Sequence, residues 1–217
     1  MLARGKNEER SACTAVRLFL ASSNPGKLDE FRALASKLAG AASLDLQLLP
    51  NFSGLPAFEE SAPTFSENAA GKALHYSRFP DLPVMADDSG LVVDALGGAP
   101  GVRSARYAGP NASSAERIAK LLAEMRQRGA KDRRARFVCV IALAVRGRVA
   151  AVFSESVEGE ILENVRGSGG FGYDPVFYFR PAAKSFAEMA AEEKNRYSHR
   201  AKAFRKLADF LATSPVL

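Results

Sequence analysis

Apolar and polar residues alternate along the first half of the chain in a pattern that predicts short strands joined by helices. The apolar runs at 16–21 and 44–49 have the length of strands, whereas apolar residues recur at helical spacing from 28 to 38. Thr64 and Glu67 form the capping pattern that precedes a helix, so a second helix is expected to begin there and to end near residue 78.

The second half of the chain predicts a long hairpin and a closing helix. Residues 136–145 and 149–157 are rich in Val, Ile and Phe and flank an Arg-Gly-Arg turn, which predicts two paired strands. A helix beginning after Ser113 precedes the hairpin, residues 176–179 predict another strand, and Ser198 is expected to cap the final helix. Strands and helices mixed in this way favour an α/β fold.

The composition is typical of a globular protein with a substantial core. Of 217 residues, 47% are hydrophobic and 25% are charged, and no apolar run reaches the roughly 18 residues that span a bilayer. Residues 1–15 contain no apolar signal segment, and we expect them to be a flexible extension before a single domain, 16–217. Cys13 and Cys139 are the only cysteines, which favours a reducing, cytoplasmic location over a disulfide framework or zinc site.

The formal net charge of +6 suits an anionic partner, either nucleic acid or a phosphorylated small molecule. The densest basic segment is 126–136, which contains no interleaved aromatic residue. A solvated helix end is the favoured interpretation of this segment, and an RNA-binding module is the alternative.

Two adjacent acids, Asp87 and Asp88, lie between apolar runs at 83–86 and 91–96, at a point where a Ser-Gly turn is expected. Like charges side by side repel unless a cation lies between them, and Mg²⁺ prefers carboxylate oxygens. The alternative is an ordinary acidic β-turn between two strands, in which Asp, Ser and Gly are common.

Two glycine-containing loops are candidates for ligand contact. The loop 22–27 joins a strand to a helix, where free N–H groups and Lys27 suit a phosphate, although an ordinary helix start has the same pattern. Residues 167–172 satisfy G-x-G-x-x-G, but a Pro follows closely where a dinucleotide fold requires a helix, so that interpretation is rejected. The glycines still let the backbone approach a ligand, with Phe171 or Tyr173 available to stack on a ring.

Five segments in this order are together distinctive: SSNPGK, TFSENAAGKA, ADDSGLVVDALGGAPGVRSARYAG, GSGGFGYDPVF and EEKNRYSHRAKA. They resemble the inosine triphosphate pyrophosphatase (Ham1-like) family over residues 16–211. Arg103 departs from the pattern, because relatives often carry an aromatic residue there.

The resemblance implies an α/β fold with a long twisted mixed β-sheet flanked by helices, in two lobes with a central nucleotide-binding cleft. It implies hydrolysis of non-standard purine nucleoside triphosphates (ITP, dITP, XTP) to the monophosphate and pyrophosphate, with Mg²⁺ as cofactor and a homodimer as the expected assembly. Other modified or pyrimidine nucleotides are the alternative substrates. No membrane and no stable nucleic-acid partner are expected.

The resemblance also assigns residues. Asp88 is expected to be the general base and, with Glu59, a metal ligand, while Glu60 and Glu67 stay open as alternatives to Glu59. Asn68 and Lys72 are expected to assist with the phosphates. The expected substrate-binding residues are Ser22, Ser23, Asn24, Pro25, Gly26, Lys27, Ser89, Phe171, Gly172, Tyr173, Asp174, Lys194, His199 and Arg200.

Overall fold

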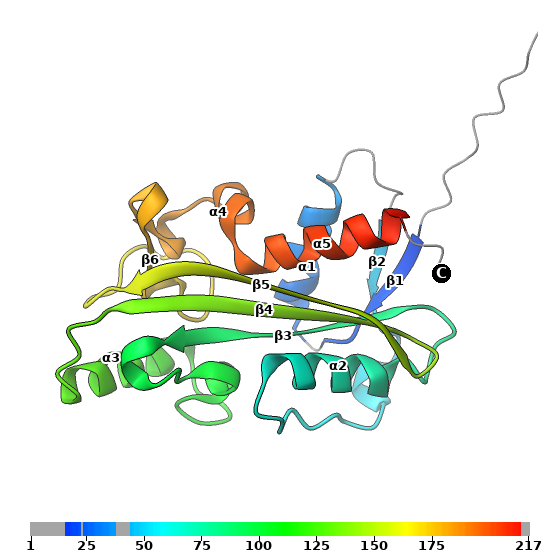
Figure 1. Ribbon diagram of the computed structural model, residues 1–217, viewed down its shortest axis with the longest axis horizontal. Helices are drawn as coiled ribbons and strands as arrows, with labels where there is room; N and C mark the ends of the chain where they lie inside the picture. The colour runs from blue at the N-terminus through cyan, green and yellow to red at the C-terminus, as the bar shows by residue number, and fades with distance from the viewer. Residues whose placement is uncertain (1–15, 23, 38–43, 214–217) are drawn as a thin grey trace, which may run out of the picture.

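A seven-stranded mixed sheet forms the centre of the computed structural model, which describes residues 16–22, 24–37 and 44–213. The strand order is β2-β1-β3-β4-β5-β6-β7 (Figure 1). The strands are β1 (Val16–Leu20), β2 (Leu44–Leu48), β3 (Val84–Val93), β4 (Arg134–Val145), β5 (Arg148–Ile161), β6 (Phe177–Phe179) and β7 (Lys184–Ser185). β1 is parallel to β2 and β3, and the other pairs are antiparallel. The predicted α/β fold is confirmed, whereas the expected extension 1–15 lies outside the described residues.

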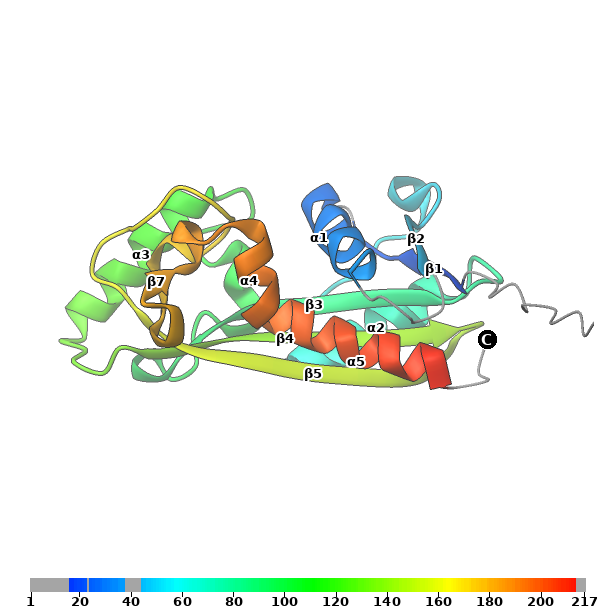
Figure 2. The ribbon, with the colours of Figure 1, turned by 90° about the horizontal axis from the view of Figure 1, so that it is seen from above.

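Helices cover both faces of the sheet (Figures 1 and 2). The α-helices are α1 (Pro25–Ala35), α2 (Phe65–Tyr76), α3 (Ser114–Gln127), α4 (Ala191–Tyr197) and α5 (His199–Thr213). The apolar sides of α1 and α5 form one core cluster with β1, β3 and β4, while α2 forms another with the opposite side chains of the same strands. None of these described helices is long and apolar enough to cross a bilayer.

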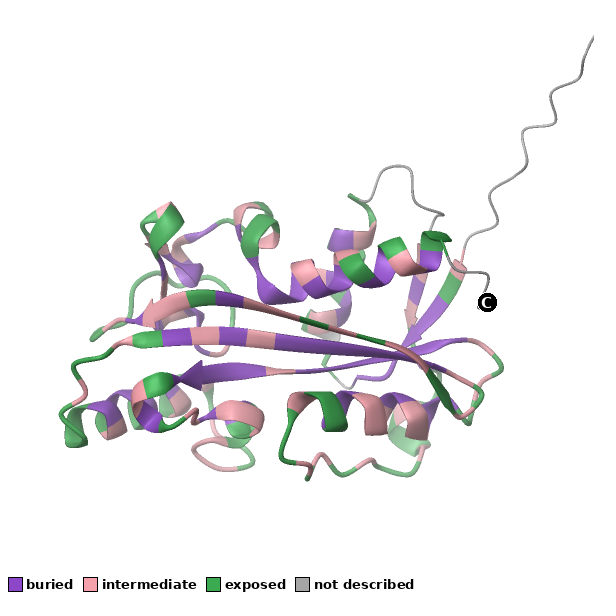
Figure 3. Cartoon of the chain, in the orientation of Figure 1, coloured by how far each residue is buried: buried purple, intermediate pink, exposed green. Residues whose placement is uncertain are grey.

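A third core cluster lies at the other end of the long strands. It joins α3 to the far ends of β3, β4 and β5 and to β6, and Figure 3 shows that β3 and β4 are buried along most of their length. The predicted hairpin is confirmed and is longer than expected, because β4 and β5 pair from Arg134↔Glu160 to Val145↔Arg148. Each end of the hairpin therefore belongs to a different core cluster.

The expected turn at Asp87, Asp88 and the following Ser-Gly is wrong, because these residues lie within β3. Pairing with β4 continues without a break from Val84↔Ala144 to Val93↔Ala135. The glycine serves packing instead, since a Cβ at Gly90 would lie 2.5 Å from both the carbonyl oxygen of Gly101 and the hydroxyl of Ser104. A close neighbour, and not a reversal of the chain, therefore explains Gly90.

One edge of β3 is open along the centre of the molecule. β1 pairs with β3 only at Phe19↔Val84 and Leu20↔Met85, and no other described strand continues along that edge. Successive side chains of a strand point to opposite faces, so side chains from both faces of β3 can reach a ligand that lies along the open edge.

Candidate active site

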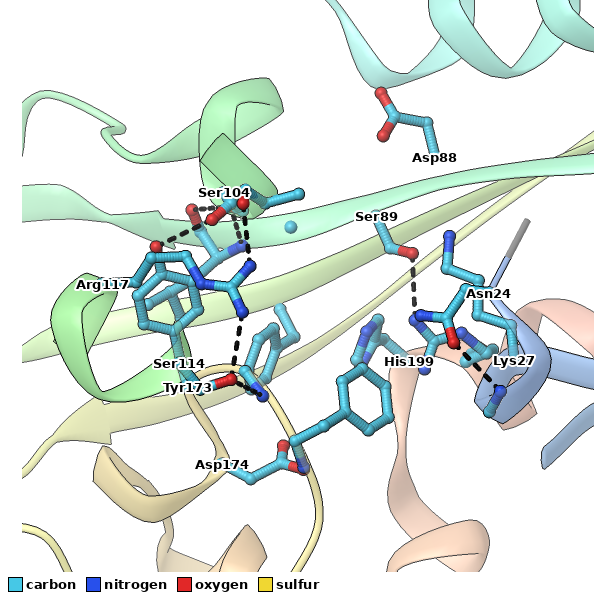
Figure 4. Close-up of a pocket in the computed structure, with 18 of the residues that line it drawn as sticks. Asn24, Lys27, Asp88, Ser89, Ser104, Ser114, Arg117, Tyr173, Asp174 and His199 are labelled. Atoms are coloured by element: carbon cyan, nitrogen blue, oxygen red, sulfur yellow. Dashed lines mark hydrogen bonds between the residues drawn. The ribbon is translucent and has the colours of Figure 1, made fainter. Parts of the chain in front are cut away.

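A cavity of about 370 Å³ lies along the open edge of β3 (Figure 4). Most of the predicted site residues line it: Asn24, Gly26, Lys27, Asp88, Ser89, Phe171, Gly172, Tyr173, Asp174, Lys194, His199 and Arg200. Ser22 and Glu59 are not among the residues that line it, whereas Ser23 and the side chain of Pro25 lie outside what the structure describes. The structure thus gathers segments that are up to 176 residues apart in sequence, from Asn24 to Arg200.

One end of the cavity is formed by the start of α1. The side chain of Asn24 caps the helix by accepting from the N–H of Gly26 at 3.0 Å, and Ser22 in turn accepts from the N–H of Asn24 at 3.1 Å. The positive end of the helix dipole therefore meets the cavity beside Lys27, an arrangement that favours phosphate.

Asp87 is buried and forms ion pairs instead of lining the cavity. Both of its carboxylate oxygens lie 2.9 Å from Nζ of Lys27, and Ser89 donates to it at 2.9 Å. Burial acts to raise the pKa of Asp87, but the charges of Lys27, Arg200 and Lys72 outweigh this effect and hold that pKa below its usual range. Asp87 therefore stays ionised and fixes Lys27 at the phosphate end of the cavity.

Asp88 points to the other face of the strand and has the opposite electrostatic character. It accepts a hydrogen bond from Nδ2 of Asn68 at 3.0 Å. Burial and the nearby charge of Glu60 raise the pKa of Asp88 from 3.8 to about 6, against the lowering effect of Asn68. A carboxylate with a pKa near neutrality is suited to accept a proton.

The acidic partner of Asp88 is Glu60 in this structure. Glu60 lines the cavity, and its side chain and backbone are held by Lys72 at 2.6 Å and by Arg106 at 2.6 Å. Glu59 is exposed, and Glu67 accepts the hydroxyl of Thr64 at the start of α2. Among the three acids left open by the sequence, the geometry therefore favours Glu60.

Asp88 and Glu60 fit a hard divalent cation. Both supply carboxylate oxygens, and burial together with the charge of Glu60 raises the pKa of Asp88, an effect that a bound cation would oppose. No cluster of three or more His, Cys, Asp or Glu side chains able to hold a metal occurs in the described part of the chain. A cation here would thus have two protein carboxylates, a number suited to Mg²⁺, which usually keeps several waters and phosphate oxygens as ligands.

The other end of the cavity is built by the second glycine loop. One oxygen of Asp174 accepts from the N–H of Phe171 at 2.8 Å and from Nζ of Lys194 at 2.6 Å. Gly170 has φ +70°, and a Cβ there would lie 2.1 Å from the same carboxylate oxygen. The loop is therefore wrapped around Asp174, and this leaves the ring of Phe171 46% exposed, below Lys194 and beside the cavity.

His199 and Arg200 begin α5 and are both buried. His199 stacks on Phe137 with ring centroids 4.8 Å apart, and burial with the charges of Arg200 and Lys194 holds its pKa well below 6.5. Arg200 bonds Glu30 at 2.7 Å and Ser89 at 3.1 Å. His199 is therefore neutral at pH 7, and Arg200 alone of the two carries a positive charge at this helix start.

Sequence reasoning missed one wall of the cavity. Ser104, Ala105, Ser114 and Arg117 line it, and Figure 4 shows the first, third and fourth of these, although none of the four residues had been given a ligand-binding role. The only available signal was the capping box of Ser113 and Glu116, which marks where α3 starts but not what the helix faces.

Three of the six basic residues in the segment 126–136 make structural contacts. Arg133 donates to the carbonyls of Ile161 and Leu162, Arg134 pairs with Asp132, and Arg136 pairs with Asp94. These contacts agree with the interpretation as a helix end and offer the RNA-binding alternative no support.

The fold and the cavity together define an α/β protein with a ligand-sized cavity along the open edge of a mixed sheet. The chain belongs to the Ham1 family, whose model matches residues 18–210. It is 50% identical over 190 residues to a dITP/XTP pyrophosphatase of Geobacillus kaustophilus, covering 88% of this chain and 91% of the relative. It is 48% identical over 200 residues to a dITP/XTP pyrophosphatase of Thermus thermophilus, covering 92% of this chain and 94% of the relative.

Solved structures show the same fold. A HAM1 protein from Coxiella burnetii superposes with a TM-score of 0.81 at 41% identity, covering 92% of this chain and 100% of that one. The Ham1 protein of Staphylococcus aureus gives 0.78 at 38% identity, covering 90% and 97%. The family resemblance and the predicted sheet flanked by helices are thereby confirmed.

Proposed function

We propose that this protein hydrolyses non-standard purine nucleoside triphosphates, namely dITP, ITP and XTP, to the nucleoside monophosphate and pyrophosphate. The observation that carries the proposal is the cavity in which a phosphate-suited helix start, a carboxylate pair and an exposed aromatic ring share one strand edge. The dITP/XTP pyrophosphatases that share about half of its residues support it.

Binding would begin at the two ends of the cavity. The N–H groups at the start of α1 and the ammonium of Lys27 would hold the triphosphate, with Lys27 already placed by Asp87. The base would stack on Phe171 and meet Lys194, His199 and Arg200 along its polar edge.

Asp88 is proposed as the general base. Its carboxylate would take a proton from the water that attacks the triphosphate, while the anhydride bond between the α- and β-phosphates breaks and pyrophosphate leaves. Asn68 holds one oxygen of Asp88 and leaves the other available. Mg²⁺, held by Asp88 and Glu60, would neutralise charge on the phosphates and lower the pKa of bound water.

Pyrophosphate release measured over a panel of nucleoside triphosphates, with Mg²⁺ and with EDTA, tests the proposal. We expect release from ITP, dITP and XTP that exceeds release from ATP and GTP by at least about tenfold and that stops with EDTA. Asp88→Asn should lose most of this activity and still bind ITP, because the geometry survives without the proton acceptor. Equal turnover of all purine and pyrimidine triphosphates would refute the proposed substrate class.

The homodimer implied by the family resemblance is part of this proposal. Light scattering, which gives the molar mass in solution, tests whether the protein is a dimer.

A further inference from the structure

The first turn of α3 forms a wall of the cavity to which the proposed mechanism gives no task. Ser114 and Arg117 lie one turn apart and so share one side of the helix. In Figure 4 they lie with Ser104 and Tyr173 on the side of the cavity away from Lys27, with His199 between. The capping box of Ser113 and Glu116 fixes the start of this helix, so the wall is built on rigid structure.

The hydroxyl oxygen of Ser114 already accepts two hydrogen bonds. One comes from the N–H of Gly172 at 3.2 Å and the other from a terminal nitrogen of Arg117 at 3.0 Å. A hydroxyl has two acceptor lone pairs and one hydrogen, so the capacity left to Ser114 is that of a donor. Ser114 lines the cavity, where a ligand acceptor can meet this hydrogen.

Arg117 adds further donors to the same wall. It bonds the carbonyl of Ala105 at 2.8 Å, and within the described part of the chain its buried Nε has no hydrogen-bond partner. A guanidinium has no acceptor. The neighbouring carbonyl of Ser104 already accepts from the hydroxyl of Tyr173 at 3.0 Å, and the capacity left to the side chains of Ser114 and Arg117 is that of donors.

A wall of hydrogen-bond donors can distinguish purines by the substituent at the 2-position, which differs among bases that share the same 6-carbonyl. Hypoxanthine, xanthine and guanine all carry an oxygen at the 6-position, so groups that recognise that oxygen accept all three. The three bases differ at the 2-position, which carries hydrogen in hypoxanthine, a carbonyl oxygen in xanthine and an amine in guanine. Donors facing the 2-position match the carbonyl, tolerate the hydrogen and leave the amine without a partner.

We propose that Ser114 and Arg117 are specificity-determining residues that face the 2-position of the purine, favour the carbonyl of xanthine and exclude the amine of guanine. This inference rests on the proposed function. It gives the cavity two recognition surfaces, one near His199 and Arg200 for the 6-position and one on α3 for the 2-position.

Two replacements of Arg117 with different chemistry provide the test. Arg117→Met removes the donors, and Arg117→Gln introduces an amide oxygen that can accept from the guanine amine. We expect kcat/KM for XTP relative to ITP to fall about tenfold in Arg117→Met, and kcat/KM for GTP relative to ITP to rise about tenfold in Arg117→Gln. Ser114→Ala removes the hydroxyl donor and should lower kcat/KM for XTP relative to ITP, as Arg117→Met does, and Ser114→Thr, which keeps the hydroxyl, should restore this ratio toward the wild-type value.

The turnover of ITP is the internal control, because a variant that folds poorly loses all three substrates together. Equal losses for ITP, XTP and GTP in both Arg117 variants, with unchanged thermal unfolding, would overturn the proposal and leave the wall a support for the glycine loop. A wild-type protein that hydrolysed none of the three would refute the proposed function instead. In that case, calorimetry would measure the binding of the same nucleotides. Weaker binding of GTP than of ITP and XTP would support the role of Ser114 and Arg117 in base selection, and equal binding of all three would contradict it.

Discussion

Adjacent aspartates in β3 are expected to respond in opposite directions when each loses its charge. Asp87→Asn should destabilise the fold, and Asp88→Asn should stabilise it when no divalent cation is present. The reason is geometric, because alternate side chains of one strand face different surroundings. Asp87 forms ion pairs with Lys27 and Arg200, whereas Asp88 faces the charge of Glu60.

The expected gain for Asp88→Asn follows from its raised pKa. The rise from 3.8 to about 6 means that the folded protein holds the ionised form less favourably than the unfolded chain does. At about 1.4 kcal/mol per pH unit, this difference amounts to about 3 kcal/mol at pH 7.5. The asparagine oxygen can still accept from Asn68, so we expect a net gain of about 2 kcal/mol in the free energy of unfolding.

Asp87→Asn is expected to lower the free energy of unfolding, because it leaves positive side chains without their carboxylate partner. Lys27 would lose the carboxylate that lies 2.9 Å from its Nζ, and Arg200 would lose a charge 3.8 Å from its Nε but keep Glu30. Removing one partner of a buried ion pair typically costs about 3–5 kcal/mol. We expect about 3 kcal/mol here, because Lys27 is partly exposed and can turn toward solvent.

Urea unfolding in EDTA at pH 7.5 measures both values through the transition midpoint, provided that the slope is unchanged. Repeating the titration with Mg²⁺ should stabilise the wild type more than Asp88→Asn, because ligand binding to the folded state adds to stability. Two variants that shift in the same direction in EDTA, or an Asp88→Asn protein less stable than wild type by more than about 1 kcal/mol, would contradict the electrostatic argument.

Two further results are expected. Gly170→Ala should lower kcat/KM for ITP more than tenfold, because its Cβ would lie 2.1 Å from the carboxylate of Asp174. Gly172→Ala is the control, because Gly172 also has a positive φ of +65° but a Cβ there would meet no atom within 4 Å. This variant should show only backbone strain of about 1 kcal/mol. Similar activity of the two variants would count against a role for that contact. In the Asp88→Asn background, where residue 88 does not titrate, the unfolding free energy should fall as the pH drops from about 7 to 5, because His199 takes up a proton in the unfolded chain but stays neutral in the folded protein. His199→Gln should reduce this slope, and an unchanged slope would show that other groups control it.

Local patterns were enough to predict most of the elements. Helical spacing, caps and the Val-rich hairpin depend on neighbours in sequence, and α1, α2, α3, β4 and β5 form close to where these patterns place them. The turn within 87–90 was wrongly predicted because Gly90 was taken as a conformational signal. Its cause is the approach of Gly101 and Ser104, a tertiary contact that sequence spacing does not contain.

The site could be predicted only as far as its segments carried recognisable chemistry. The sequence offered three acids as companions of Asp88, and the fold favours Glu60 because Lys72 and Arg106 hold it beside the cavity. Ser114 and Arg117 resemble any first helical turn, and their position in the cavity depends on where α3 packs. The neutral state of His199 likewise depends on burial against Phe137.

Because β1 ends early, part of the edge of β3 has no neighbouring strand, and this has a consequence for aggregation. A bare strand edge usually recruits strands from other chains and starts aggregation. Here the bare stretch of β3 forms the floor of a recess, and beyond it the Ser104 hydroxyl and the Ala99 carbonyl occupy the N–H groups of Leu91 and Val93. The bare stretch of β3 is thus short and bounded at both ends, by β1 and by the segment 99–104, so the gap that admits a small ligand offers a foreign strand few free backbone groups to pair with.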